Sequence, residues 1–294
     1  MTPRRPRVRR RDLTGLLALS GTALLASGCN RDPGPVPTSS DIPRDPLAQL
    51  DEVRWDGRTA QDVLALPITD SADELNAWAD LGTDDATLDP TRQALVTFLE
   101  ASYLSPRVLS DLDAAETFTH VDASTPGYWH DLLQTAWDDG DRHLYAFALA
   151  EPFATVGRPA LAMDWFRAER DSVPVLQLGG TIAWSVVDTQ THAVGVIAYQ
   201  LGIVADIDLR GEAGDAGSAT SASIRVSIHG LDGCGLRDAD GLVAPALTDT
   251  AEHRAAQQAT MDSVIASPRI RPEDVLDLES AAFSANDATN ILCD

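Results

Sequence analysis

The sequence contains no lysine, since all 22 of its basic residues are arginine. A P-loop lysine, a Schiff-base lysine and a Ser-x-x-Lys nucleophile are therefore excluded, because each of these chemistries needs the lysine amine. The basic residues are outnumbered by 45 acidic residues, which gives a net charge of −23 for the 294 residues. A surface of this sign repels phosphate backbones, so we expect no nucleic-acid partner.

Signatures of common catalytic sites are also lacking. The chain has no G-x-S-x-G, no H-E-x-x-H and no glycine-rich dinucleotide-binding loop after a strand. His120, His192, His229 and His253 have no serine, cysteine or carboxylate partner at a recognisable spacing, so each is expected to be a surface or satisfied histidine. The sequence therefore predicts no catalytic residue, no metal ligand and no cofactor.

Long hydrophobic runs are missing as well. The uncharged stretch from Leu13 to Gly28 is too short and too weakly apolar to span a membrane, which needs about 20 apolar residues. It follows an arginine-rich start and ends at Cys29. A basic start, a short apolar middle and small residues before a break are typical of a secretory signal peptide.

Two resemblances refine this prediction. Leu25-Ala26-Ser27-Gly28-Cys29 resembles a bacterial lipobox, with Ala26 where that motif usually has leucine. The resemblance implies that residues 1–28 are removed and that Cys29 carries acyl chains such as palmitate, which anchor the protein to the outer face of the cytoplasmic membrane. The alternative is ordinary cleavage after Gly28 and secretion. Arg10-Arg11-Asp12-Leu13 resembles a twin-arginine signal, and the general secretory route is the alternative.

The remaining chain divides into a tether and one domain. Six arginines and one aspartate leave with residues 1–28, so the net charge changes from −23 to −28 and electrostatics disfavours contact with an anionic membrane. Residues 29–46 hold the lipidated cysteine and a proline-rich stretch, which favours an extended conformation of roughly 3 Å per residue. Residues 47–294 are expected to form a single globular domain.

The other two cysteines form a candidate pair. Disulfides persist outside the cytoplasm, so we expect a bridge between Cys234 and Cys293. The bridge would tie the C-terminus to the predicted turn Asp232-Gly233-Cys234-Gly235 and stabilise the fold by roughly 2–4 kcal/mol. The alternative is two unpaired buried thiols.

Residues 47–140 show helical periodicity with four start signals. These are the capping box Ser71-Ala72-Asp73-Glu74 and the dipeptides Asp89-Pro90, Ser105-Pro106 and Thr125-Pro126. The last opens the strongest amphipathic helix, whose apolar residues are Trp129, Leu132, Leu133, Ala136 and Trp137.

After Asp141 the period of the hydrophobic pattern becomes two, which indicates strands. The five predicted strands are Leu144–Ala150, Ala160–Ala168, Val175–Val187, Ala193–Ile207 and Ala219–Leu231. No helical pattern separates the last three strands, so an antiparallel meander is expected. A helical segment, Asp249–Ser284, should pack on the edge or outer face of the sheet. The sequence thus predicts an α+β fold, with N-terminal helices on a curved antiparallel meander and a C-terminal helical segment.

This element order, over about residues 90–231, resembles the cone-shaped nuclear transport factor 2-like fold, which several exported bacterial lipoproteins share. That fold hosts binding proteins, isomerases and dehydratases, so the resemblance implies no single activity. A pocket in the curved sheet is expected to be lined by Trp165, Trp184 and Tyr199. The alternative is that these aromatic side chains fill the core.

Two acidic segments are candidate cation sites. Residues 128–143 include Asp138, Asp139, Asp141 and His143, and Asp238-Ala239-Asp240-Gly241 partly matches a calcium-binding loop. Acidic clusters arise freely in so acidic a chain, so a solvated helix end and two turns are the preferred interpretation.

The preferred function is a membrane-anchored, non-catalytic accessory or ligand-binding domain, with an unidentified protein or small molecule as its partner. The alternative is a small-molecule isomerase, dehydratase or hydrolase that uses the pocket in the sheet. A solute-binding subunit of a transporter is disfavoured, because it needs alternating strand–helix units in two lobes.

Overall fold

A computed structural model describes residues 44–79, 85–208, 217–277 and 279–283. The predicted signal peptide, Cys29, most of the tether and Cys293 lie outside these ranges. Within them, every helix is too short or too polar to cross a membrane.

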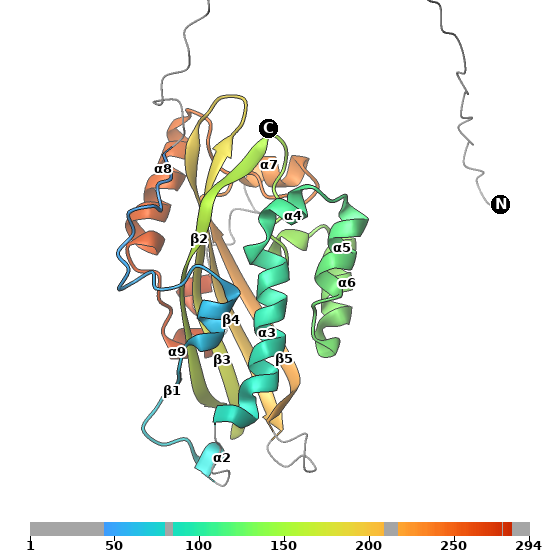
Figure 1. Ribbon diagram of the computed structural model, residues 1–294, viewed down its shortest axis with the longest axis vertical. Coiled ribbons are helices and arrows are strands. Elements are labelled where there is room, and N and C mark those ends of the chain that lie inside the picture. Colours follow the sequence, from blue (N-terminus) through green and yellow to red (C-terminus); the bar gives the residue numbers. More distant parts are fainter. Residues whose placement is uncertain (1–43, 80–84, 209–216, 278, 284–294) are drawn as a thin grey trace, which may run out of the picture. The chain divides into compact units, whose positions relative to one another are not determined.

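A five-stranded sheet forms the centre of the domain, in the order β1-β2-β3-β4-β5 (Figure 1). The strands are β1 (Ile68–Asp70), β2 (Phe153–Arg170), β3 (Val173–Asp188), β4 (Val194–Asp208) and β5 (Ser218–His229). Strands β2 to β5 form an antiparallel meander, while β1 pairs with β2 in parallel. With helices before and after the sheet, the predicted α+β fold class is confirmed.

The helical elements lie in two groups along the chain. Those before the meander are α1 (Ala60–Ala65), α2 (Asn76–Ala79), η1 (Asp85–Leu88), α3 (Asp89–Leu99), η2 (Glu100–Leu104), α4 (Pro106–Ser110), α5 (Ala114–Asp122), η3 (Gly127–Trp129), α6 (His130–Asp139) and η4 (Arg142–Leu144). Those after it are α7 (Gly233–Asp238), α8 (Ala251–Ala259), η5 (Thr260–Ile265) and α9 (Pro272–Leu276).

The predicted strand Leu144–Ala150 is wrong. This segment contains the end of η4 and then irregular chain, with an isolated bridge from Leu149 to Val243. Its backbone is satisfied without a ladder, because the Phe147 N–H donates to the Ser102 carbonyl and the Ala150 N–H to that of Val243. A continuous run of buried residues thus resembled a strand although it lies in the core as a loop.

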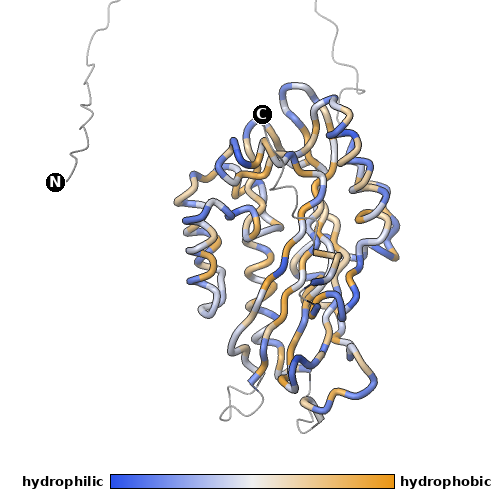
Figure 2. Tube along the Cα trace, turned by 180° about the vertical axis from the view of Figure 1, so that it is seen from behind, coloured by the Kyte–Doolittle hydropathy of each residue, from blue (hydrophilic) through white to orange (hydrophobic). Residues whose placement is uncertain are grey.

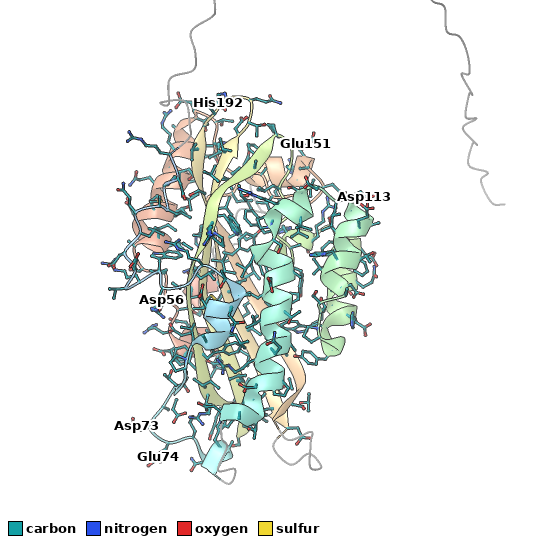
Figure 3. The ribbon with its side chains drawn as sticks, in the orientation of Figure 1. Asp56, Asp73, Glu74, Asp113, Glu151 and His192 are labelled. Atoms are coloured by element: carbon teal, nitrogen blue, oxygen red, sulfur yellow. The ribbon has the colours of Figure 1, made fainter. Side chains whose placement is uncertain are left out.

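The helix starts were predicted with mixed success. Ser105-Pro106 is correct, because α4 begins at Pro106. The predicted capping box at Ser71 is wrong. The Ser71 N–H donates to the Arg167 carbonyl, so the chain here continues the pairing of β1 with β2 and does not begin a helix. The observed capping boxes start at Thr59 before α1 and at Asp113 before α5. Figure 3 labels Asp113.

The two faces of the sheet carry side chains of different size. The inner face, which packs against α3 and its neighbours, holds large residues, among them Trp165, Leu178, Trp184, Tyr199 and Ile203. Beyond them, Phe98 packs edge-on against Trp129, with ring centroids 5.0 Å apart. These buried rings form the main hydrophobic core.

The outer face is built from small residues. Across the strands, one row contains Ala160, Ala183, Ala198 and His229, and all three alanines are fully buried. Of the elements that cover it, η5 contacts β4 and α9 contacts β2, β3 and β4, so the C-terminal segment packs on the outer face as expected. Leu47 and Trp55 pack on the same face. Figure 2 shows the domain from behind, with hydrophobic residues on both the strands and the helices.

Candidate functional site

The aromatic side chains predicted to line a pocket are part of the inner core. Trp165 Nε1 donates to the Val63 carbonyl at 2.9 Å, and Trp184 Nε1 to that of Tyr103 at 2.9 Å. Trp165, Trp184 and Tyr199 are all at most 4% exposed. They fill the core, and none of them lines the cavities described below.

A groove of about 580 Å³ lies on the outer side of the sheet, beside α8. We call it the α8 groove. It is lined by Pro46, Ala193, Val194, Gly195, Val196, Ala246, Leu247, Thr248, Asp249, His253, Arg254, Gln257, Gln258 and Met261. Figure 3 labels His192, the neighbour of Ala193, in the turn between β3 and β4, which marks this end of the sheet.

The groove forms because α8 stands away from the sheet. No residue of Ala251–Ala259 is buried, although the helix is well started by Thr250, whose hydroxyl accepts from the His253 N–H. Its link to the sheet is Gln257, whose amide accepts from the Val196 N–H and donates to the carbonyls of Val196 and Gly230. The β4–β5 ladder ends at His229, and beyond that point the Gln257 side chain hydrogen-bonds to β4 in place of β5.

Two glycines permit this close approach. A Cβ on Gly195 would lie 2.5 Å from Leu247 and 2.6 Å from the Gln257 amide oxygen. Gly230 has φ +78°, and a Cβ there would collide with the Val196 carbonyl. Glycine at these two positions therefore lets the chain turn away from β4 after β5, and the turn leaves space beside α8.

A hydroxyl, an imidazole and a carboxylate are connected at one end of the groove. Thr248 Oγ1 lies 2.6 Å from His253 Nδ1, and the Thr248 N–H donates to the same nitrogen at 3.2 Å. On the other side of the ring, His253 Nε2 lies 3.6 Å from Asp232 Oδ2. Asp232 is itself held by the N–H groups of Cys234 and Gly235 at the start of α7. The arrangement favours the tautomer with hydrogen on Nε2.

Thr248, His253 and Asp232 lie far enough apart in the sequence that no motif links them. His253 was expected to be a satisfied histidine, and its hydrogen bonds agree with that expectation. The three positions show no motif spacing, because they are brought together by the turn after β5 and the start of α8. The available signal was local, since Thr250 and His253 have the spacing of an N-cap and its third helical residue.

The remaining lining divides into an apolar wall and a polar rim. The wall is formed by Val194, Val196, Ala246, Leu247 and Met261. At the rim, Gln258 donates to Asp262 at 2.8 Å, and Arg254 pairs with Asp249. The groove can therefore accept an apolar group against the sheet and a polar group near α8.

The two acidic segments singled out in the sequence meet at a second cavity, of about 290 Å³. Asp139, Asp141 and His143 line it from one side and Asp240 from the other. Within the described ranges, no group of three or more His, Cys, Asp or Glu side chains is placed to hold a metal ion.

The cysteine predictions fall mostly outside the described chain. Cys234 lies in α7, where its N–H donates to Asp232. Cys29 and Cys293 are outside the described residues, so lipid attachment and the bridge from Cys234 to Cys293 stay predictions.

Comparison with known proteins gives no relative. No protein-family model, no curated protein and no solved structure matches the chain. The likeness to the nuclear transport factor 2-like fold therefore stays a prediction from element order.

Proposed function

We propose that the chain is an exported, lipid-anchored binding protein whose α8 groove takes a small organic molecule with an apolar body and a hydrogen-bonding end. The observation that carries this proposal is the groove itself. Its volume of about 580 Å³ is within the range of small-molecule sites, and its lining combines an apolar wall with a few polar groups.

The position of the groove suits a tethered binding domain. Pro46, at the end of the predicted tether, is one of its lining residues, so the groove lies where the tether joins the folded domain. The filled interior around Trp165, Trp184 and Tyr199 supports a site outside the core.

A filling variant tests the groove. Gln258→Trp places an indole in it and leaves Gln257 on the sheet. Gln134→Trp is a matched control, because Gln134 is also exposed on a helix and donates to an aspartate four residues later, at 3.0 Å. We expect saturable binding of the dye anilinonaphthalene sulfonate by the wild type and Gln134→Trp, and its loss in Gln258→Trp. Equal binding by all three proteins would contradict the proposal.

The anchor is tested separately by the intact mass of the mature protein extracted from membranes. We expect a chain that begins at Cys29 and carries acyl groups. A bare cysteine, an uncleaved leader or an unprocessed chain in the cytosolic fraction would overturn the anchoring part of the proposal.

A hydrolase is the second candidate, and the hydrogen bond from Thr248 to His253 favours it. In such a reaction Oγ1 attacks an ester carbonyl while His253 Nδ1 takes its proton, and Asp232 stabilises the imidazolium through Nε2. The bond to the leaving alkoxide breaks, the alkoxide takes the proton from His253, and water then hydrolyses the threonyl ester.

Nitrophenyl acetate is a suitable substrate for distinguishing the two candidates. A hydrolase would lose its activity in Thr248→Ala, retain it in Thr248→Ser, and be unaffected by Thr135→Ala on the exposed side of α6. We expect no turnover that depends on Thr248, because its N–H also binds His253 and gives the cluster a structural role at the start of α8.

A further inference from the structure

One edge of β4 is uncovered where this strand lines the α8 groove. The β3–β4 ladder extends to the pair of Val187 and Val194, whereas the β4–β5 ladder reaches only the pair of Ala198 and His229. Residues 194–197 therefore have β3 on one side and, among the described residues, no paired strand on the other. Val194 and Val196 both belong to the lining of the groove.

The backbone of Val194 presents an unpaired donor and acceptor along this edge. In a strand, the N–H and C=O groups of alternate residues point to the same edge. Those of Val196 point away from β3, because both are hydrogen-bonded to the Gln257 amide. Val194 lies two residues earlier, so its N–H and C=O point the same way. Within the described ranges, no loop or side chain donates to or accepts from either group.

The Gln257 side chain shows what this edge can bind. Its amide oxygen accepts from the Val196 N–H at 2.8 Å, and its nitrogen donates to the Val196 carbonyl at 3.1 Å. These are the two bonds that a residue of a neighbouring antiparallel strand makes. An amide from outside can repeat them at Val194, because unpaired strand edges are templates for a further strand.

The rest of the lining favours an apolar and uncharged ligand. Leu247 and Met261 belong to the wall of the groove, so an apolar side chain placed against them is removed from water. The charged pair at the rim is Arg254 and Asp249, which contact each other. Because this pair is neutral as a whole, it gives no preference for a ligand of either charge.

We propose that the α8 groove binds a short, uncharged peptide in an extended conformation, as an added strand on the edge of β4. One peptide residue donates to the Val194 carbonyl and accepts from the Val194 N–H, and an apolar side chain of the peptide packs against Leu247 and Met261. This inference rests on the proposed binding role of the groove and names the class of its ligand.

Calorimetric titration of the full chain tests the ligand class. The probe is an acetylated and amidated tripeptide with leucine between two alanines. We expect saturable binding by the wild type and its loss in Gln258→Trp. The matched control is the ester analogue, in which oxygen replaces each backbone N–H group while the shape is kept. It should bind at least about fivefold more weakly, because it cannot donate to the Val194 carbonyl.

Two variants of Val194 separate its backbone from its side chain. Val194→Pro removes the N–H, and the ladder with β3 does not use this group. Proline is tolerated at the first residue of a strand, which Val194 is in β4. Val194→Thr keeps the N–H with a side chain of similar shape. We expect the peptide to bind about tenfold or more weakly to Val194→Pro, and no more than about threefold more weakly to Val194→Thr. Equal losses in the two variants would overturn the proposal.

Valine-selective nitrogen NMR of the wild type gives a readout that does not depend on the folding of a variant. The peptide should slow hydrogen exchange of the Val194 amide and leave that of Val108, in α4, unchanged. No change at Val194 on saturation with the peptide would contradict the proposal.

The dye experiment separates failure of this inference from failure of the proposed function. If anilinonaphthalene sulfonate binds and is lost in Gln258→Trp, but the peptide does not bind or the ester analogue binds equally well, the groove is a binding site for another class of ligand and this inference alone is overturned. If neither the dye nor the peptide binds, the proposed function fails with it.

Discussion

The two faces of the sheet differ in how tightly they are covered. The inner face carries large aromatic and aliphatic side chains that interlock with α3 and its neighbours. The outer face carries mostly alanine, glycine, valine and polar residues. It is covered by η5, by α9 and by the segment with Leu47 and Trp55, while α8 stands away. Small side chains allow helices to approach the strand backbone in one place and leave open space in another.

This difference separates the stability of the fold from the binding role that we propose for the α8 groove. Burial of large side chains on the inner face supplies most of the hydrophobic stabilisation, because it scales with the apolar area removed from water. The exposed residues on the rim of the α8 groove lie outside this core, so we expect them to change with little cost to the fold. The predictions that follow test this contrast, from the largest effect to the smallest.

Truncation on the inner face should be the most damaging change. Trp165→Ala should lower the free energy of unfolding by about 3–5 kcal/mol, because it leaves a cavity and removes the hydrogen bond to Val63. Val264→Ala, in η5 where it packs on the outer face, should cost about 2 kcal/mol. Chemical denaturation measures both values. Equal losses would contradict the contrast between the two faces.

Acid should destabilise the protein through the outer face. Burial lowers the pKa of His229 to about 4, from its ordinary value of 6.5. Between these values the unfolded chain binds a proton that the folded chain does not, so stability is complete above pH 6.5 and is lost as the pH falls towards 4. The shift corresponds to about 3 kcal/mol.

Denaturation of the wild type and His229→Gln over this pH range isolates the contribution of His229. The variant should lose less stability on acidification than the wild type. His143 adds a component of the same sign, because burial also lowers its pKa. Parallel curves for the wild type and His229→Gln would show that His229 has the same pKa in the folded and the unfolded chain, which would contradict this prediction.

Replacement of Gln177 by an apolar residue should stabilise the fold. This fully buried residue on β3 has no hydrogen-bond partner for either end of its amide among the described residues. Gln177→Leu removes both unsatisfied groups at similar volume, so the free energy of unfolding should rise by about 1–3 kcal/mol. Thr181→Val on the same face should instead destabilise, because the Thr181 hydroxyl donates to the Pro268 carbonyl at 2.5 Å. Destabilisation by Gln177→Leu would indicate that the amide has a partner.

The rim of the α8 groove should be the least sensitive. Asp249→Asn breaks the pair with Arg254, in which both side chains are mostly exposed. The expected change is below about 1 kcal/mol, and salt should reduce it further. A larger loss in thermal denaturation would mean that the rim supports the fold.

The period-two pattern predicted the central strands well. Val175–Val187 and Ala193–Ile207 lie within one or two residues of β3 and β4, because half of each strand faces the large inner core. β1 was missed, since three residues are too few to show alternation. The buried run at Leu144–Ala150 was misassigned, because burial on all sides has no diagnostic period.

The lining of the α8 groove could not be predicted from the sequence. The α8 groove combines residues from the tether end, the start of β4, the loop before α8, α8 itself and η5, and no local pattern links Pro46 to Ala193 or Gln257. The second cavity, of about 290 Å³, was partly predicted from the sequence. Both of its segments were recognised as acidic turns, but their meeting depends on how α6 and α7 pack.

Native mass spectrometry of the full chain, purified under mild conditions from the cells that make it, tests the proposed binding role most directly. A small molecule should remain bound to the wild type and to Gln134→Trp and be missing from Gln258→Trp. If Gln258→Trp retains the same bound mass, or if the wild type carries no ligand under conditions that preserve its fold, the α8 groove is not the binding site of this protein.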